Sequence, residues 1–126
     1  MFSILIPTYN FDCLSLIQEL EGQCEALRRA DGEFDYEIIV ADDCSTRKDL
    51  VQALQELTEQ LGERVKLIAL TQNVGRAEVR NKLLREAHGA WVLLMDSDAR
   101  VVRKDFLQKY WEQRHKAEVI IGGILH

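Results

Sequence analysis

The sequence predicts a single α/β domain with a mostly parallel sheet and helices on both faces. Short apolar runs rich in Val, Ile and Leu alternate with longer segments whose apolar residues recur at helical spacing. This alternation is typical of parallel strands joined by crossover helices. With 126 residues, the chain is long enough for one domain with a substantial core, and no linker or repeat divides it.

Apolar runs bounded by turn residues predict the strands. The first run ends at Pro7, the only proline, and the fourth follows Gly89. Continuous apolar runs of this kind are typical of parallel strands buried on both faces. The expected strands cover residues 2–6, 36–41, 65–70, 90–95 and 118–121.

Apolar stripes and end signals predict four helices. Asp12 is a candidate cap for the first helix, and Ser45 or Thr46 for the second, which Gly62 closes. The third is expected to carry His88 in its last turn. The expected first, third and fourth helices cover residues 13–29, 76–88 and 105–116, and the second carries Leu50, Leu54, Leu57 and Leu61 on its apolar stripe.

The charge of the chain is negative overall but unevenly spread. A formal net charge of −5 argues against general nucleic-acid binding. Residues 1–75 hold 6 Lys and Arg against 14 Asp and Glu, a net −8, whereas residues 76–104 hold 7 against 4, a net +3. The basic segment suits a small polyanion such as a diphosphate, and the alternative is an ordinary solvated helix face.

Composition also bears on location. Cys13, Cys24 and Cys44 lack metal-ligand spacing, which favours free thiols in a reducing cytoplasm, with Cys24 in the core. No signal peptide or membrane-spanning stretch is recognisable. We therefore expect a cytoplasmic protein, and association with the inner face of the membrane only through regions outside this chain.

Two carboxylates follow the fourth expected strand. Asp96 and Asp98 are two residues apart, so an extended chain can direct both to one place. Carboxylate oxygens aimed together suit a hard cation such as Mg²⁺ or Mn²⁺. The alternative is a simple turn, because Asp and Ser commonly bond to their own backbone.

Polar loops follow the other strands as well, and the carboxyl edge of a parallel sheet is where ligands bind. Tyr9 could stack on a nucleobase while Asp43 accepts a hydrogen bond from a base N–H. Arg76 and Arg80 share a helix face near a helix N-terminus, which favours a phosphate, and Gly75 permits close backbone approach. The convergence favours a binding site over separate turns.

Four blocks of the chain carry a resemblance to a known family. The blocks are ILIPTYN at 4–10, IIVADDCS at 38–45, NVG at 73–75 with RN at 80–81, and LLMDSD at 93–98. Their order and spacing resemble those of the family 2 glycosyltransferases, which have the GT-A fold, and the resemblance covers nearly the whole chain.

The resemblance implies a role for each matching residue. Residues 1–126 would form the donor-binding, N-terminal part of an inverting glycosyltransferase that takes a nucleotide-sugar, expected to be a UDP-sugar, in the synthesis of a polysaccharide or similar product. The implied nucleotide-sugar contacts are Pro7, Thr8, Tyr9 and Asp43 with Asp42 supporting their loop, Arg76 and Arg80 near the diphosphate, and Asp96 near the ribose and sugar.

The resemblance also implies a metal. Asp98 would be the ligand for Mn²⁺ or Mg²⁺ in the Asp-x-Asp motif, with help from Asp96. The sequence departs from the family at Ala99, where an acidic residue is common, and at Val79, where an alanine is common.

The resemblance further implies parts that this chain does not contain. The catalytic base and the site for a saccharide or lipid-linked acceptor are expected beyond residue 126, so the chain is expected to be truncated and inactive in transfer. Apolar surface left exposed would favour a homodimer.

Two other functions stay open. A nucleotide-binding module without catalysis would share the site and lack a base. A phosphohydrolase of the haloacid dehalogenase type also has Asp-x-Asp after an apolar strand, with Asp96 as its nucleophile. That family usually places the motif on its first strand with Thr or Val at the position of Arg100, which disfavours it. There is no Gly-x-Gly-x-x-Gly and no Walker A sequence.

Overall fold

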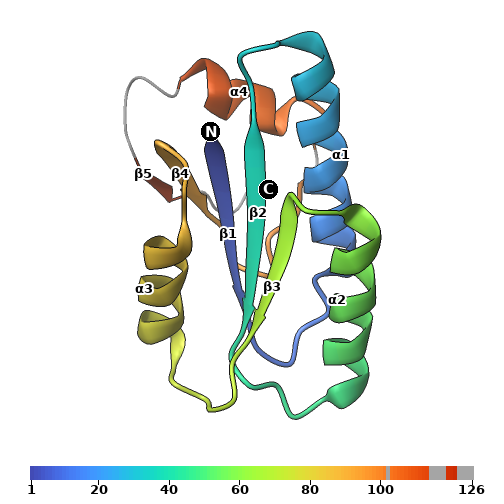
Figure 1. Cartoon of the computed structure of the whole chain (residues 1–126), viewed down its shortest axis with the longest axis vertical. Coiled ribbons are helices and arrows are strands. Elements are labelled where there is room, and N and C mark those ends of the chain that lie inside the picture. Colours follow the sequence, from blue (N-terminus) through green and yellow to red (C-terminus); the bar gives the residue numbers. More distant parts are fainter. Residues whose placement is uncertain (102, 114–118, 122–126) are drawn as a thin grey trace.

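A computed structural model describes residues 1–101, 103–113 and 119–121, and it has the predicted α/β architecture (Figure 1). All strand pairs in the described sheet are parallel, in the order β3-β2-β1-β4-β5. The strands are β1 Phe2–Thr8, β2 Tyr36–Asp42, β3 Val65–Ala69, β4 Trp91–Leu94 and β5 Val119–Ile121. The helices are α1 Leu14–Ala30, α2 Lys48–Leu61, α3 Arg76–Glu86 and α4 Phe106–Glu112.

The central strand β1 lies where the strand order changes direction. Leu5 pairs with Ile39 of β2 on one side and with Leu94 of β4 on the other. The chain moves from β1 outward through β2 to β3, then crosses back to β4. A reversal of this kind leaves a crevice at the carboxyl ends of the strands, where ligands bind in open α/β sheets.

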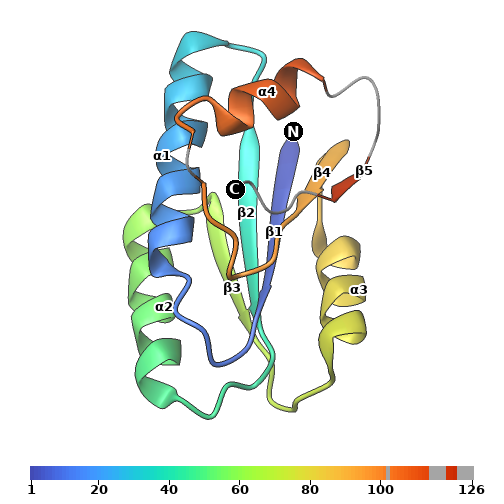
Figure 2. The same ribbon diagram turned by 180° about the vertical axis from the view of Figure 1, so that it is seen from behind.

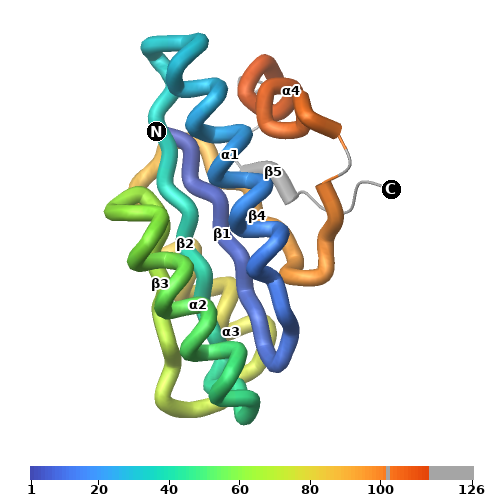
Figure 3. The backbone as a smooth tube through the Cα atoms, turned by 90° about the vertical axis from the view of Figure 1, so that its right-hand side faces the viewer, coloured from blue at the N-terminus to red at the C-terminus, as the bar shows by residue number. Residues whose placement is uncertain are grey.

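The helices cover the two faces of the sheet unequally. On one face α1, α2 and α4 pack over a large apolar cluster that includes Ile4, Ile38 and Leu93. On the other face α3 alone contributes helical side chains, Val79 and Leu83, to a smaller cluster. Figure 3 shows α4 beside the C-terminal half of α1, and the Gln23 side chain on α1 joins them by accepting from the Leu107 N–H. Among the described helices, none has the length and apolar character to span a membrane.

The start of α2 differs from the prediction. Ser45 and Thr46 do not cap the helix, which begins at Lys48 after Arg47 without a side-chain cap. Both hydroxyls instead bond within the loops: Ser45 donates to the Asp42 carboxylate, and Thr46 accepts from the Asn10 amide. The predicted end is confirmed, since Gly62 follows the helix at a φ of +93°, where glycine is favoured.

Two other helix ends differ from the predictions. Helix α3 ends at Glu86, so His88 lies beyond the helix. The N–H and the ring of His88 bond to Glu37 on β2 instead. Helix α4 is described over Phe106–Glu112, and the expected residues 114–116 lie outside the described residues. The cap predicted for α1 is wrong, because Cys13 precedes the helix and no side-chain cap is formed. Asp12 lies one residue earlier, and its carboxylate accepts from the Leu14 N–H at 3.0 Å.

Candidate functional site

A cleft of about 550 Å³ opens at the carboxyl ends of the strands. This is the lower end of the sheet in Figures 1 and 2, where β1, β2 and β3 end and α3 begins. All four predicted polar loops contribute to it, so the predicted convergence is confirmed. The cleft is lined by Pro7, Thr8, Tyr9, Phe11, Asp43, Asn73, Gly75, Arg76, Val79, Asp96, Ser97 and Asp98.

Of the predicted site residues, Asp42 and Arg80 do not line the cleft. Asp42 is 2% exposed, and its carboxylate accepts from the backbone N–H of Ser45 at 3.0 Å and from the Ser45 hydroxyl. It thereby holds the turn after β2, which includes Cys44 at a φ of +57°. Asp42 therefore has the supporting position that the family resemblance implies.

Asn10 joins the loop after β1 to the loop after β2. Its backbone N–H donates to the Ser45 hydroxyl at 2.8 Å, and its side-chain amide donates to the Thr46 hydroxyl at 2.9 Å. Its side-chain oxygen accepts from the Arg47 N–H at 3.1 Å. This role of Asn10 was not predicted from the sequence. The available signal was an asparagine just after a strand, since Asn tolerates the positive φ of 49° found here.

Asp43 ties the end of β2 to the start of α3. One carboxylate oxygen accepts from the Val74 N–H at 2.7 Å and the other from the Gly75 N–H at 3.0 Å. The Asn73 amide also donates to the Asp43 carbonyl at 3.0 Å. Gly75 has a φ of +92°, so this approach needs a glycine. The carboxylate lines the cleft, and its remaining lone pairs could accept from a nucleobase.

Thr8 and Tyr9 form the wall contributed by β1. Thr8 is buried and its hydroxyl donates within its own loop to the Phe11 carbonyl at 3.4 Å. The side chains of Tyr9 and Phe11 are 47% and 45% exposed. Exposed aromatic rings beside a polar cleft supply a surface for stacking.

Arg80 reaches from α3 to the acidic end of β4. Its Nη2 lies 3.1 Å from a carboxylate oxygen of Asp96. Its Nε is buried and has no hydrogen-bond partner among the residues that the structure describes. Arg76 lies one turn earlier and lines the cleft directly. The two arginines therefore bring positive charge to the cleft beside Asp96, one within it and one at its margin.

The two carboxylates after β4 suit a metal ion that takes its other coordinating oxygens from a bound phosphate and from water. Asp98 is exposed and Asp96 is half-exposed, and both line the cleft. No group of three or more His, Cys, Asp or Glu side chains arranged to hold an ion occurs in the described part of the chain. Mg²⁺ is commonly bound by one or two carboxylates, with phosphate and water oxygens in the other positions.

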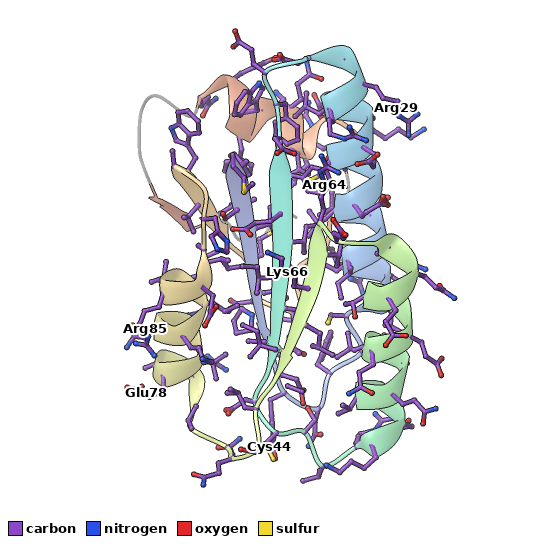
Figure 4. All side chains as sticks on the ribbon, viewed as in Figure 1. Arg29, Cys44, Arg64, Lys66, Glu78 and Arg85 are labelled. Carbon is purple, nitrogen blue, oxygen red and sulfur yellow. The ribbon has the colours of Figure 1, made fainter. Side chains whose placement is uncertain are left out.

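The three cysteines are not among the residues that line the cleft. Burial raises the pKa of Cys13 to about 11, and burial likewise raises the pKa of Cys24 well above its usual range. Thiols held protonated in this way are poor nucleophiles. Cys24 is in the core as predicted, and all three cysteines are free. Cys44, at the lower end of the sheet in Figure 4, is half-buried.

The parallel sheet, its switch point and the acidic end of β4 are features of the GT-A fold. The model of the family described as glycosyl transferase family 2 matches residues 3–126. The chain belongs to this family.

Relatives and solved structures agree with the family assignment. Poly(ribitol-phosphate) beta-N-acetylglucosaminyltransferase TarS of Staphylococcus aureus (strain Mu50 / ATCC 700699) is 35% identical over 98 residues, 77% of this chain and 16% of TarS. A crystal structure of S. aureus TarS 1–349 in complex with UDP-GlcNAc has a TM-score of 0.69 at 28% identity, covering 91% of this chain and 31% of that one.

A second solved structure has a different donor. The mannosyltransferase PcManGT from Pyrobaculum calidifontis, in complex with GDP-Man and Mn²⁺, has a TM-score of 0.66 at 26% identity, covering 90% of this chain and 32% of that one. The chain thus spans about a third of these two solved structures and 16% of the TarS relative.

Proposed function

We propose that this chain is the donor-binding part of an inverting glycosyltransferase that binds a nucleotide-sugar together with a divalent cation. The observation that carries the proposal is the single cleft in which Tyr9, Asp43, Arg76 and Asp98 converge from four loops. Two solved neighbours, of whose chains this one covers 31% and 32%, are complexes with UDP-GlcNAc and with GDP-Man.

Each wall of the cleft suits one part of the donor. Tyr9 and Phe11 offer aromatic faces to a nucleobase, with Pro7 and Thr8 beside them and Asp43 as an acceptor. Arg76 lies at the first residue of α3, where the helix dipole also favours a diphosphate. We propose UDP as the nucleotide; the mannosyltransferase neighbour makes GDP the alternative that must be tested.

Arg80 and Asp96 form a pair that a donor could rearrange. Both side chains are partly exposed, 37% and 46%, so their ion pair is weak in the absence of ligand. A diphosphate would give the arginine an acceptor of higher charge, and this includes its Nε, which has no hydrogen-bond partner in the described part of the chain. Asp96 would then be free to face the ribose, the sugar or the metal.

Asp98 and Asp96 would hold Mn²⁺ or Mg²⁺ at the end of β4. When bound, the cation would neutralise negative charge on the diphosphate of the donor. The residues of this chain bind and orient the donor. We propose that the catalytic base and the saccharide or lipid-linked acceptor site lie beyond residue 126.

We propose a cytoplasmic location, with contact to the inner face of the membrane only through regions outside this chain. A homodimer also stays a prediction, which light scattering over a range of concentrations tests. A clean monomer throughout the range would contradict it.

Calorimetric titration tests the donor site directly. UDP, UDP-sugars and GDP are titrated with and without Mn²⁺ into the chain and into Asp98→Ala. We expect metal-dependent binding that Asp98→Ala abolishes. Asp35→Ala is the matched control, because Asp35 is a carboxylate at the opposite end of the sheet, paired with Arg64. If no nucleoside diphosphate binds, the proposal is wrong.

A second candidate, a nucleotide-binding module without catalysis, would use the same cleft. It predicts the same titration, but no turnover of the donor even in a protein that continues beyond residue 126. An assay for release of UDP from a UDP-sugar by such a longer protein, with candidate acceptors added, distinguishes the two. The family match leaves the phosphohydrolase alternative without support.

A further inference from the structure

Helix α3, which carries both site arginines, has little apolar anchoring of its own. Val79 and Leu83 are its only buried residues. Its outer side is charged, and Figure 4 shows Glu78 and Arg85 pointing away from the sheet. Because apolar burial supplies most of what holds a helix to a sheet, α3 needs other attachments to keep its arginines in place.

Carboxylates of β2 and its following loop tie down both ends of α3. Before the helix, Asp43 accepts from the N–H groups of Val74 and Gly75. After the helix, Glu37 accepts from the His88 N–H at 2.6 Å and contacts the His88 ring Nδ1 at 3.0 Å. Glu37 is the second residue of β2, so the two attachments lie at opposite ends of the same strand.

The Glu37 side chain is buried among donors. Its carboxylate is 3% exposed, accepts from the Ser3 hydroxyl at 2.7 Å and lies 3.4 Å from the Lys66 ammonium on β3. Figure 4 shows Lys66 over the middle of the sheet. Burial acts to raise the pKa of Glu37, but the hydrogen bonds from His88 and Ser3 outweigh it, so the pKa lies below its usual range. The carboxylate is therefore charged at neutral pH.

The segment after α3 has little room to move. The Gly89 N–H donates to the Ser3 hydroxyl at 2.8 Å. A Cβ added at Gly89 would lie 2.6 Å from the Met1 carbonyl oxygen and 2.9 Å from the Ser3 backbone nitrogen. Ser3 thus links Glu37 and Gly89, and together they fix the position at which α3 ends and β4 begins.

We propose that Glu37 is a positioning residue for the diphosphate-binding arginines and acts through α3. Asp43 fixes the start of α3, but a helix fixed only at its start could still change its angle to the sheet. Glu37 prevents this change by fixing the other end, so Arg76 and Arg80 stay directed at the cleft and at Asp96. Misplacement of a binding group by about 1 Å is costly for function. The inference rests on the proposed function, because it concerns the affinity of the same cleft for a nucleoside diphosphate.

Calorimetric titration of UDP and Mn²⁺ into Glu37→Ala tests this inference. We expect about tenfold weaker affinity, in the range of couplings transmitted through packed elements. The control is Glu25→Ala, which removes a carboxylate that accepts from Tyr36 at 2.7 Å and pairs with Arg28 on the opposite face of the sheet. Glu25→Ala is expected to bind UDP as the parent does. Glu37→Gln, whose amide oxygen can still accept from the His88 N–H, should restore most of the affinity.

A double-mutant cycle distinguishes positioning from general loosening. If Glu37 acts through the arginines of α3, Glu37→Ala should cost less affinity in an Arg80→Ala background than in the parent. Fully additive losses would overturn the inference. So would equal losses in Glu37→Ala and Glu25→Ala.

Hydrogen exchange gives a readout that needs no ligand. Amides of α3 should exchange faster in Glu37→Ala than in the parent, while those of α1 stay unchanged. Ser3→Ala, a milder change at the same cluster, should show the same pattern to a smaller extent even if Glu37→Ala fails to fold. Unchanged α3 exchange in both variants would contradict the inference.

The titrations also distinguish failure of the proposed function from failure of this inference. If the parent chain binds no nucleoside diphosphate, the proposed function is wrong. If the parent binds and Glu37→Ala binds equally well, only the positioning role is wrong.

Discussion

The two faces of the sheet are built in different ways. On the face of α1, α2 and α4, 21 buried residues among those described form one continuous apolar cluster. On the face of α3 the corresponding cluster has 7, two of them from the helix. The second face instead carries the buried Glu37, its donors and the attachments of Asp43.

The difference means that one face supplies most of the stability and the other positions the residues of the cleft. Apolar burial is non-directional and scales with area, so the first face dominates the free energy of folding. Hydrogen bonds are directional, so the second face fixes where α3 and its arginines lie. Elements with few buried apolar contacts open more readily than the core, and binding elements are drawn from them. The proposed donor cleft therefore depends on the less stable face.

The largest effect on stability is expected from the face with the large cluster. Leu20 on α1 is fully buried, and Leu20→Ala should lower the free energy of unfolding by about 3 kcal/mol, since it removes apolar contacts and leaves a cavity. Urea unfolding measures the loss. UDP affinity at low urea should match that of the parent; an affinity loss comparable to that of Glu37→Ala would show that the two faces are not separable.

A smaller effect on stability, but a larger one on binding, is expected from Gly89→Ala. The added methyl meets backbone atoms of Met1 and Ser3, which cannot move aside cheaply. Overpacking of this kind costs about 2 kcal/mol. Because the shift falls at the end of α3, UDP affinity should decrease although Gly89 lies outside the cleft. Urea unfolding and calorimetry on the same sample test both parts, and an unchanged affinity would contradict the link between this segment and the cleft.

Much of the fold follows from local signals in the sequence. Apolar runs predicted the strands because a strand buried on both faces is mostly apolar, as in β1 and β2, where Ser3 and Glu37 are buried exceptions. The parallel order and the edge where the polar loops meet then follow from chain connectivity, which is why Asp43, Arg76 and Asp98 were placed at one edge in advance. Gly62 was predictable because a positive φ at a helix end is a local property.

Partnerships between distant residues were not predictable in this way. Ser45 and Thr46 have the composition of helix caps, but Asp42 and Asn10 compete for their hydroxyls. Glu37 in a strand resembles an ordinary solvent-facing position, and only tertiary structure brings His88 and Ser3 to it. Residue type shows that such a group can form hydrogen bonds, but it does not show with which partner.

Acid should weaken the attachment of α3 selectively. The pKa of Glu37 in the folded protein lies below its usual range, so its contribution is complete above the ordinary carboxyl pKa and is lost as the pH falls through the folded value. His88 and Lys66 are the titratable groups that face it. The effect is smaller than that of Gly89→Ala, because a protonated carboxyl still forms hydrogen bonds. Unfolding free energies of the parent and Glu37→Gln should therefore converge as the pH falls from 7 to 3. A constant difference would contradict this assignment.

The smallest effect is expected on the outer surface of α3. Lys82 and Glu86 form an i,i+4 ion pair at 3.5 Å, with side chains 37% and 48% exposed. Water and salt screen such pairs, so Glu86→Ala should change the free energy of unfolding by only about 0.3 kcal/mol. UDP affinity should stay that of the parent, which urea unfolding and calorimetry together check. Glu86 and Glu37 are both carboxylates near the end of α3, but only Glu37 is buried and bonded to the chain that follows the helix. If Glu86→Ala loosened UDP binding as much as Glu37→Ala, the arginines would depend on helix stability in general rather than on how the helix is tied to β2.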